Sequence, residues 1–531
     1  MTGGLFAGYD HDGFFDEVFT ADGEVRPHYR ALVARLGLFS ADELARRERL
    51  RDAAFRTQGI TFTVYGDEEN VERTFPMDLI PRIIPPDEWA EVERGLVQRV
   101  DALNRFLDDL YVGEQAIIRD GIVPRWMVLS SDGFERQAAG LAVPHSSRCV
   151  VAGIDLVRDA DGTYRVLEDN LRNPSGISYV LENRAAMTRV LSLAFTDHRV
   201  RSVDHYGAML LGALRHVAPP AAGDDPTVVV LTPGVYNSAY FEHAFLARQM
   251  GVELVEGRDL VVDDHVVSMR TTHGLRRVDV IYRRIDDDFL DPVVFRPDSQ
   301  LGVPGLMAAA RAGTVTIANA AGNGVADDKA IYAFVPEIIR YYLGEDPILA
   351  SVPTYLLDDP DHRAEVLDRL GDLVVKPVAE SGGYGMLIGP AATDAEIESF
   401  RHKLEADPRG YIAQEVVSLS RHPTLIDDHL EGRHIDLRPF VISGEKIEVI
   451  PGGLTRVALR RGSLVVNSSQ GGGSKDTWVL APDREAKRPG DRAEGADLER
   501  VEGDDRRETT QMPAVGVDGD PTEHAAGGAR P

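Results

Sequence analysis

The sequence is short of cysteine and of positive charge. Among its 531 residues Cys149 is the single cysteine, so no intrachain disulfide can form, which favours a reducing compartment. Lys and Arg together number 58, against 86 Asp and Glu, and the formal net charge is −28. Binding to nucleic acids or to anionic membranes requires an excess of positive charge, so we predict neither kind of partner.

Targeting and membrane signals are missing as well. The N-terminus has no basic segment followed by an apolar one, and no apolar run reaches about 18 residues. We therefore expect neither a signal peptide nor a transmembrane helix, and we predict a cytoplasmic protein. Residues 483–531 contain no aromatic residue and little apolar content, so this acidic tail is predicted to be disordered.

The remaining chain has enough apolar residues, 43% overall, to form a large core. Apolar residues at helical spacing predict a helix over 87–112. From about residue 224, a strand, a helix and a second strand follow one another in the manner of a Rossmann-like sheet, and residues 278–282 should add a strand. A further unit begins with a helix over 327–343. Its other expected elements are a helix over 394–405 and strands over 373–377, 385–388, 411–417, 437–443, 446–451 and 463–467.

The dipeptide Asp161-Gly162 lies between two stretches that favour β-strands. A two-residue type I′ turn here would place Asp155 directly opposite Glu168, with Asn170 on the same face of the sheet. Two opposed carboxylates repel each other unless a cation offsets them, and hard oxygen ligands suit Mg²⁺. The alternative is a solvated polar face on a surface hairpin.

A glycine-rich loop follows the strand that ends near Lys376. It consists of Ser381, Gly382, Gly383, Tyr384 and Gly385. Glycines allow backbone N–H groups to approach phosphate oxygens, and the lysine adds a point charge. A strand follows the loop, whereas the Walker A loop and the dinucleotide fingerprint both open a helix. The pattern predicts a flap over a nucleotide, and an ordinary glycine-rich hairpin is the alternative.

Two arginines, Arg438 and Arg456, occur in otherwise apolar stretches. Such arginines are costly unless they pair with anions, so each indicates either a bound anion or a structural ion pair.

Together these features resemble the ATP-grasp superfamily. The resemblance implies that Lys329 and Lys376 bind ATP phosphates under the loop 381–385. It also implies that Arg438 and Arg456 stabilise the transferring phosphoryl group and the acyl phosphate. The segment that holds adenine through its backbone would comprise Gln414, Glu415 and Val417.

The order of the motifs resembles the circularly permuted branch of that superfamily, which includes proteins like glutathionylspermidine synthetase. The residues that match its metal ligands, Asp155, Glu168 and Asn170, precede the ATP lysines instead of following them. The following turn resembles a substrate-facing turn and contains Asn173, Ser175 and Gly176. The sequence has no Cys/His arrangement typical of an amidase.

The resemblance covers roughly residues 60–480 and implies an α/β (α+β) fold: a circularly permuted ATP-grasp fold with a Rossmann-like pre-ATP-grasp domain. We predict an N-terminal helical and irregular region (1–60) and a permuted part of the C-terminal subdomain that carries the metal hairpin (60–200). Next come the Rossmann-like domain (224–326), the lid or nucleotide subdomain (327–418), the rest of the C-terminal subdomain (419–480) and the tail (483–531).

The function implied is that of an ADP-forming carboxylate–amine ligase that uses ATP and Mg²⁺, with Mn²⁺ as an alternative metal. Its substrates would be a small-molecule or peptide carboxylate and an amine. The alternatives are a phosphotransferase that stops after phosphoryl transfer, and a nucleotide-binding scaffold without turnover. By resemblance alone, protein partners of the same pathway are also expected.

Overall fold

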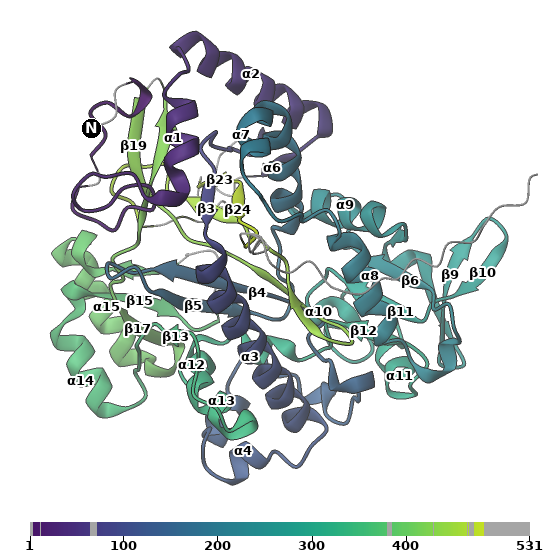
Figure 1. The fold of residues 1–531 in the computed structure, drawn as a ribbon. Helices are drawn as coiled ribbons and strands as arrows, with labels where there is room; N and C mark the ends of the chain where they lie inside the picture. Colours follow the sequence, from purple (N-terminus) through teal and green to yellow (C-terminus); the bar gives the residue numbers. More distant parts are fainter. Residues whose placement is uncertain are drawn as a thin grey trace, which may run out of the picture. The chain divides into compact units, whose positions relative to one another are not determined.

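The structure is a computed structural model. It describes residues 4–10, 12–63, 72–379, 385–427, 429–464, 466 and 472–482. The described residues up to Pro482 form one compact unit (Figure 1). The tail predicted for 483–531 lies outside the described residues, and the predicted domain boundaries remain predictions. No helix in the described part of the chain is both long and apolar enough to cross a bilayer.

A five-stranded main sheet carries one wall of the site. Its strand order is β13 (Ala350–Ser351), β5 (Tyr164–Asn170), β4 (Val151–Arg158), β20 (Phe440–Ser443) and β21 (Ile447–Val449). The long helix α3 (Pro86–Tyr111) runs across this sheet and packs against β20, β21 and α13 (Val335–Leu343) (Figure 1). Its buried stripe includes Trp89, Leu96, Leu103 and Phe106, which confirms the predicted helix.

The hairpin β4–β5 places Asp155 opposite Glu168, as predicted, but by a different route. The predicted two-residue turn is wrong: Asp159 N donates to Thr163 O, so the connection is longer, and among the two turn residues only Gly162 has a positive φ. The register near the turn is therefore shifted by one residue. A β-bulge at Leu167 shifts it back before Glu168.

A second, antiparallel sheet, here called the lid sheet, has the order β14 (Thr354–Leu356), β17 (Tyr411–Glu415), β15 (Leu373–Pro377) and β16 (Leu387–Ile388). Helices α14 (Pro360–Asp368) and α15 (Asp394–Ala406) belong to the same part of the molecule. A capping box at Thr393 and Glu396 starts α15 near the predicted residue. The lid sheet carries Lys376 and Gln414.

A third sheet is parallel and confirms the predicted Rossmann-like pattern. Its order is β12 (Thr316–Ala318), β11 (Val280–Arg283), β6 (Val228–Leu231) and β7 (Glu253–Val255). Helices α8 (Tyr206–His216), α9 (Tyr240–Met250) and α11 (Leu306–Arg311) lie around it (Figure 1). The strands β8 (Leu260–Asp263), β9 (Val266–Thr271) and β10 (Gly274–Arg277) extend from it as a separate antiparallel sheet.

The remaining elements join distant parts of the chain. Strand β3 (Arg82–Ile84) pairs with β24 (Thr477–Val479), and β22 (Thr455–Val457) pairs with β23 (Gly473–Lys475). The short strands β1 (Thr61–Thr63) and β2 (Glu72–Thr74) pair with each other. The other α-helices are α1 (Arg30–Leu36), α2 (Ala41–Gln58), α4 (Ala116–Arg119), α5 (Arg125–Leu129), α6 (Ile177–Val190), α7 (Ser192–Asp197), α10 (Asp287–Leu290) and α12 (Lys329–Tyr332).

Several elements differ from the sequence-based expectation. The helix predicted over 327–343 is two helices, α12 and α13, and the strand predicted from residue 437 begins at Phe440. The hairpin of β18 (Arg421–Ile426) and β19 (His429–His434) was not predicted. Of the strand predicted over 463–467, the described residues 463, 464 and 466 are not in a strand. The mixed α/β architecture itself is confirmed.

Candidate active site

Two lysines from different elements lie near one carboxylate of the main sheet, and one of them forms an ion pair with it. Lys329 Nζ, at the start of α12, lies 3.0 Å from Glu168 Oε1 on β5. Lys376 on β15 is half-buried, and Nζ donates to Gln414 Oε1 at 2.7 Å. Burial lowers the pKa of Lys376 to about 8, although the negative charge of Glu168 acts to raise it. The fold therefore brings one lysine from α12 and one from β15 near the same carboxylate of β5.

Asp155, on β4 beside Glu168, is bound by two arginines. Arg438 forms a two-pronged ion pair with it, in which Nη2 donates to Oδ2 at 2.7 Å, and Arg456 Nη2 donates to the same oxygen at 2.6 Å. Burial alone would raise the pKa of Asp155, but the two arginines outweigh it and lower that pKa to about 2. Arg456 also donates from Nε to both oxygens of Asp436 at 3.0 Å.

These ion pairs change the interpretation of the opposed carboxylates. A cation was expected to offset their repulsion, and the structure supplies it from the chain: Arg438 and Arg456 to Asp155, and Lys329 to Glu168. Counting Lys376 and Asp436 as well, four cationic side chains face three carboxylates, which leaves one positive charge in excess. That balance suits an anionic ligand.

The donor set for a divalent metal is available in part. Glu168 and Asn170 share one face of β5, as alternate residues do, and Asp169 between them faces the other way, where Arg99 of α3 pairs with it at 2.7 Å. The side-chain Nδ2 of Asn170 is buried without a hydrogen-bond partner among the described residues. Carboxylate and carboxamide oxygens suit Mg²⁺, so Glu168 and Asn170 fit such an ion, whereas both Asp155 oxygens already accept from arginines.

The segment predicted to hold adenine lies at the end of the lid sheet. Gln414 is buried and bridges Lys376 and Thr354, whose Oγ1 accepts from Gln414 Nε2 at 2.9 Å. Glu415 points elsewhere, because its carboxylate accepts from Tyr355 at 2.7 Å and from Arg369. Only the backbone of Glu415 therefore remains for a ligand.

An apolar cluster continues from this segment into the main sheet. Val417 packs there with the bulged residue Leu167 and with Leu464, around the buried side chains of Val157, Val352 and Leu419. Leu167 directly precedes Glu168, so this cluster adjoins the carboxylate that pairs with Lys329.

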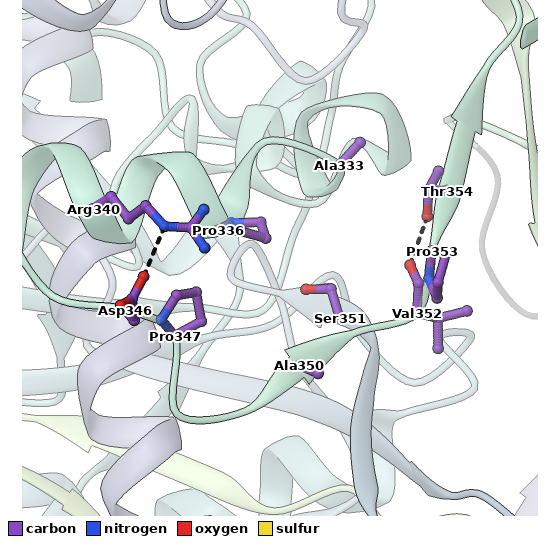
Figure 2. Close-up of a pocket in the computed structure, with 10 residues that line it drawn as sticks. All are labelled: Ala333, Pro336, Arg340, Asp346, Pro347, Ala350, Ser351, Val352, Pro353 and Thr354. Atoms are coloured by element: carbon purple, nitrogen blue, oxygen red, sulfur yellow. Dashed lines mark hydrogen bonds and ion pairs between the residues drawn. The ribbon is translucent and has the colours of Figure 1, made fainter.

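A cavity of about 430 Å³ lies beside the connection from β13 to the lid sheet. Figure 2 shows Thr354 and Val352 on one side of it and the ion pair of Arg340 with Asp346 on the other. Thr354 thus belongs both to the wall of this cavity and to the hydrogen-bonded chain that reaches Lys376.

Of the predicted phosphate loop, only Gly385 lies within the described residues. Its φ is +67°, a left-handed conformation that favours glycine. Ser381, Gly382, Gly383 and Tyr384 lie outside the described residues.

The predicted substrate turn is held by the Rossmann-like part of the chain. Asn173 Nδ2 donates to Ile285 O at 3.1 Å, and Gly176 N donates to Glu242 at 2.8 Å. Gly176 has a φ of +113°, which requires glycine. Ser175 O accepts from Arg438 Nη1 at 3.4 Å, so this turn is joined directly to the Asp155 ion pairs.

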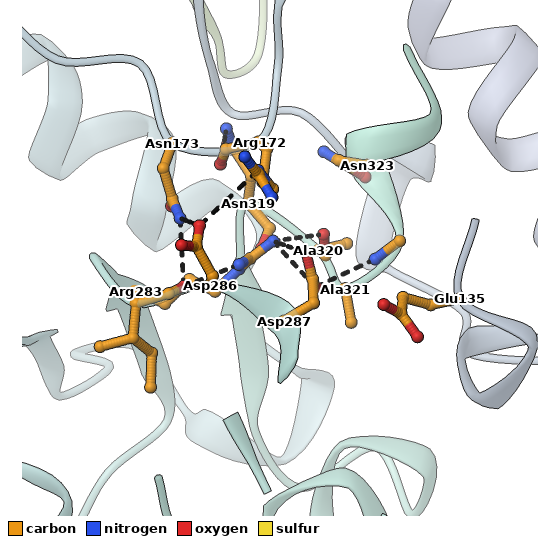
Figure 3. A network of polar contacts seen from close by, with 12 residues as sticks. Glu135, Arg172, Asn173, Arg283, Asp286, Asp287, Asn319, Ala320, Ala321 and Asn323 are labelled. Carbon is orange, nitrogen blue, oxygen red and sulfur yellow. Dashed lines mark hydrogen bonds and ion pairs between the residues drawn. The ribbon is translucent and has the colours of Figure 1, made fainter. Parts of the chain in front are cut away.

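Asn173 also belongs to a polar network, because its Nδ2 donates to Asp286 Oδ1 at 3.2 Å (Figure 3). Arg283 pairs with Asp287, and Arg172 lies near Asp286. Burial raises the pKa of Glu135 to about 7, and the charges of Asp287 and Asp288 contribute. Because Arg172 is two residues past Asn170, and an extended residue spans at most about 3.6 Å, this network adjoins the proposed metal face.

Several residues at the site were hard to recognise from sequence alone. Asp436 and Asp327 are ordinary aspartates in sequence, yet Asp436 shares Arg456 with Asp155, and Asp327 Oδ1 accepts from Leu171 N at 2.6 Å. Glu135 belongs to a loop region without a motif. The only available signal was proximity in sequence: Asp436 is two residues before Arg438, and Asp327 is two residues before Lys329.

Asp327 gives a testable pH effect. Burial raises its pKa to about 7, despite Arg172 and the N–H groups of Leu171 and Arg172. Between its unfolded and folded pKa values the native state holds more protons than the unfolded state, so Asp327 lowers the free energy of unfolding as pH rises through that window. Asp327→Asn cannot titrate. We expect the free energy of unfolding of the variant, measured with urea, to increase by roughly 2 kcal/mol relative to that of the wild type between about pH 5 and about pH 8. Parallel pH dependences of the two proteins would contradict this expectation.

Comparisons with known proteins agree with this geometry. A family model described as circularly permuted ATP-grasp type 2 matches residues 81–458. An uncharacterised protein of Synechocystis sp. is 57% identical over 473 residues, which are 89% of this chain and 98% of that protein. A Frankia alni protein provisionally named a glutamate–cysteine ligase is 49% identical over 465 residues, which are 88% of this chain. The match covers 54% of the Frankia protein, so its name describes a chain almost twice as long as the matched part.

A solved structure has a similar fold. It is a glutathione synthetase-like effector from Globodera pallida in its apo form, with a TM-score of 0.54 and 11% sequence identity. The alignment covers 83% of this chain and 98% of that structure.

Proposed function

Because the chain belongs to the circularly permuted ATP-grasp family, we propose that it is an ADP-forming ligase that joins a carboxylate to an amine through an acyl phosphate. The observation that carries the proposal is the convergence of Lys329, Lys376 and two arginines on the opposed carboxylates of β4 and β5. This excess of positive charge suits a triphosphate and a phosphorylated intermediate.

The nucleotide would lie between the lid sheet and the main sheet. Its phosphates would meet Lys329 and Lys376, with the loop 381–385 as cover, and its base would meet the backbone of 414–417 and the apolar cluster around Leu167. Glu168 and Asn170 would hold Mg²⁺, or Mn²⁺ in its place, and the ion would neutralise charge on the phosphate oxygens. Asp155, the third predicted ligand, would stay paired with Arg438 and Arg456 beside them.

The chemistry assigned to the chain has two steps. The substrate carboxylate attacks the γ-phosphorus of ATP, which yields an acyl phosphate and ADP. The amine then attacks the acyl carbon and phosphate leaves, while the amine loses a proton. Arg438 and Arg456 would bind the phosphoryl oxygens, because each guanidinium group has five N–H donors and its contacts with Asp155, Asp436 or Ser175 use three of them.

The substrate end is assigned to the turn of Asn173, Ser175 and Gly176. Arg438 contacts Ser175, so an acid seated on this turn would reach the arginines that stabilise its acyl phosphate. The network around Asp287 and Glu135 lies at the same end. We place the acid and the amine here and propose that they are small molecules or peptides. We propose neither a nucleic acid nor a membrane as a partner.

The direct test measures products. Purified protein is incubated with ATP, Mg²⁺ and pools of carboxylates and amines, and ADP and new masses are recorded. Glutamate and cysteine belong in the pools, because the name of the Frankia relative mentions them. We expect ADP release that depends on both substrates and a product joined by an amide. ADP release with a stable phosphorylated acid and no amide would indicate a phosphotransferase, and no ADP from any pool would indicate a binding scaffold.

Hydroxylamine separates the first step from the second. Hydroxylamine attacks an acyl phosphate and converts it to a hydroxamate. The acid substrate, ATP and hydroxylamine should therefore give hydroxamate and ADP when the amine substrate is left out. An amide product formed without a trappable hydroxamate would argue against this intermediate.

Glu168→Gln tests the metal assignment. The amide keeps the size of the side chain and an oxygen for Lys329, but removes the charge that a divalent ion prefers. We expect the Mg²⁺ concentration for half-maximal ADP formation to rise by roughly tenfold or more, with little change in melting temperature. An unchanged Mg²⁺ dependence would leave Glu168 as a structural partner of Lys329.

A further inference from the structure

Lys329 stands at the start of a helix too short to fix its own position. α12 has four residues, and Asp328 caps it by accepting from Ala330 N at 2.8 Å through Oδ1. A helix of one turn gains little from its internal hydrogen bonds, so its orientation depends on what holds the cap. The second oxygen of Asp328, Oδ2, accepts from Arg409 Nη2 at 2.8 Å.

Arg409 comes from a different part of the structure. It lies in the turn between α15 and β17 of the lid sheet, where Asp407 Oδ1 accepts from Gly410 N at 3.1 Å. Its guanidinium also donates to Ser130 Oγ at 3.1 Å and to Met127 O at 3.3 Å, at the end of α5. One side chain therefore joins the lid sheet, α5 and the cap of the lysine helix.

The backbone makes the same connection in parallel. Lys329 N donates to Val378 O at 3.4 Å, and Val378 N donates to Gly410 O at 3.0 Å. Val378 is two residues past Lys376, so the segments that carry the two lysines are hydrogen-bonded to each other next to Arg409. This contact holds together the backbone segments from which the two lysine side chains extend.

We infer that Arg409 is a positioning residue for nucleotide binding, which holds Lys329 in register with Lys376 by fixing Asp328 against α5 and the lid sheet. The inference rests on the proposed function, because it assigns Lys329 to ATP. This role requires a planar guanidinium group that donates to several acceptors at once, whereas the ammonium group of a lysine is a single point charge. Asp328 is 5% exposed, so the loss of Arg409 would leave a buried carboxylate without its cation.

The test compares MgATP affinity among variants by calorimetry. Arg409→Ala should weaken binding roughly tenfold, the size of effect that the loss of a helix cap gives, and Arg409→Lys should recover part of it. Arg401→Ala is the matched control: Arg401 lies on α15 of the same part and pairs with Glu398 of that helix at 3.4 Å. It should bind MgATP as wild type does.

The decisive arm is a double-variant cycle. If Arg409 acts through Lys329, then Arg409→Ala should cost no further affinity once Lys329→Ala is present. Additive losses, or an affinity for Arg409→Ala equal to that of Arg401→Ala, would overturn the inference. Hydrogen exchange of residues 329–333 without nucleotide should be faster in Arg409→Ala than in Arg401→Ala, and equal exchange would also overturn it. Wild-type protein that does not bind MgATP would instead refute the proposed function, and the exchange comparison would still test Arg409.

Discussion

Replacing Lys376 with alanine is expected to lower MgATP turnover roughly 100-fold, the loss that follows when one preorganised charged donor is removed from a phosphoryl-transfer site. Lys376 is half-buried, and Gln414, itself held by Thr354, fixes its ammonium group. The group is therefore oriented before a ligand arrives. Lys403→Ala is the control, because Lys403 lies on α15 over the Phe400 ring. Steady-state kinetics of ADP release measures both variants.

The pH dependence of binding gives a second readout of the same residue. Because burial lowers the pKa of Lys376 to about 8, the ammonium loses its proton as pH rises through that value. The negative phosphates of ATP bind the ammonium form of Lys376 more tightly than the neutral amine, so MgATP affinity should weaken above about pH 8. If binding takes up one proton, the dissociation constant should rise by a factor that approaches about ten for each pH unit. Lys376→Arg cannot lose its charge and should lack this dependence. A wild-type affinity that is flat in this range, or a Lys376→Ala variant with normal turnover, would remove Lys376 from the phosphate site.

Asp155→Asn is expected to lower the free energy of unfolding by about 3–5 kcal/mol, because it removes the carboxylate that the buried Arg456 and the half-buried Arg438 share. Like-charge repulsion from Glu168, taken alone, would give the opposite sign, because the loss of one carboxylate would relieve it. The arginines reverse the sign. The stabilisation belongs to the charged form, so it is present above the unfolded pKa and is lost as pH falls toward the folded pKa of about 2.

Asp169→Asn is the matched control for this variant. Asp169 is on the opposite face of the same hairpin, equally buried, and Arg99 binds both its oxygens at 2.7 Å. We expect both variants to lose stability in urea unfolding, but only Asp155→Asn to lose ADP formation at temperatures where both are folded. Equal activity of the two variants would show that the Asp155 cluster supports the fold alone. An unchanged stability of Asp155→Asn would show that its ion pairs contribute nothing net.

The sequence predicted the local structure around the site well, because strands, caps and helix periodicity depend on neighbours within a few residues. Helix α3 and the strand ending at Lys376 began and ended close to the expected residues. The opposition of Asp155 and Glu168 was confirmed, although two departures cancelled: a longer turn and a bulge at Leu167. A bulge depends on how the strand meets its surroundings, and the dipeptide Asp161-Gly162 contains no information about it.

The sequence alone thus determined which residue types lie on which face of a hairpin, and that a lysine-bearing strand precedes a glycine-rich loop. What only the tertiary structure decided is the partner of each charge. Asp155 lies 283 residues from Arg438 and 301 from Arg456, and Asp328 lies 81 from Arg409. Coulomb energy depends on distance and burial, which no local pattern encodes. The same aspartate is therefore a repelling neighbour of Glu168 in the hairpin and the anchor of two arginines in the folded protein.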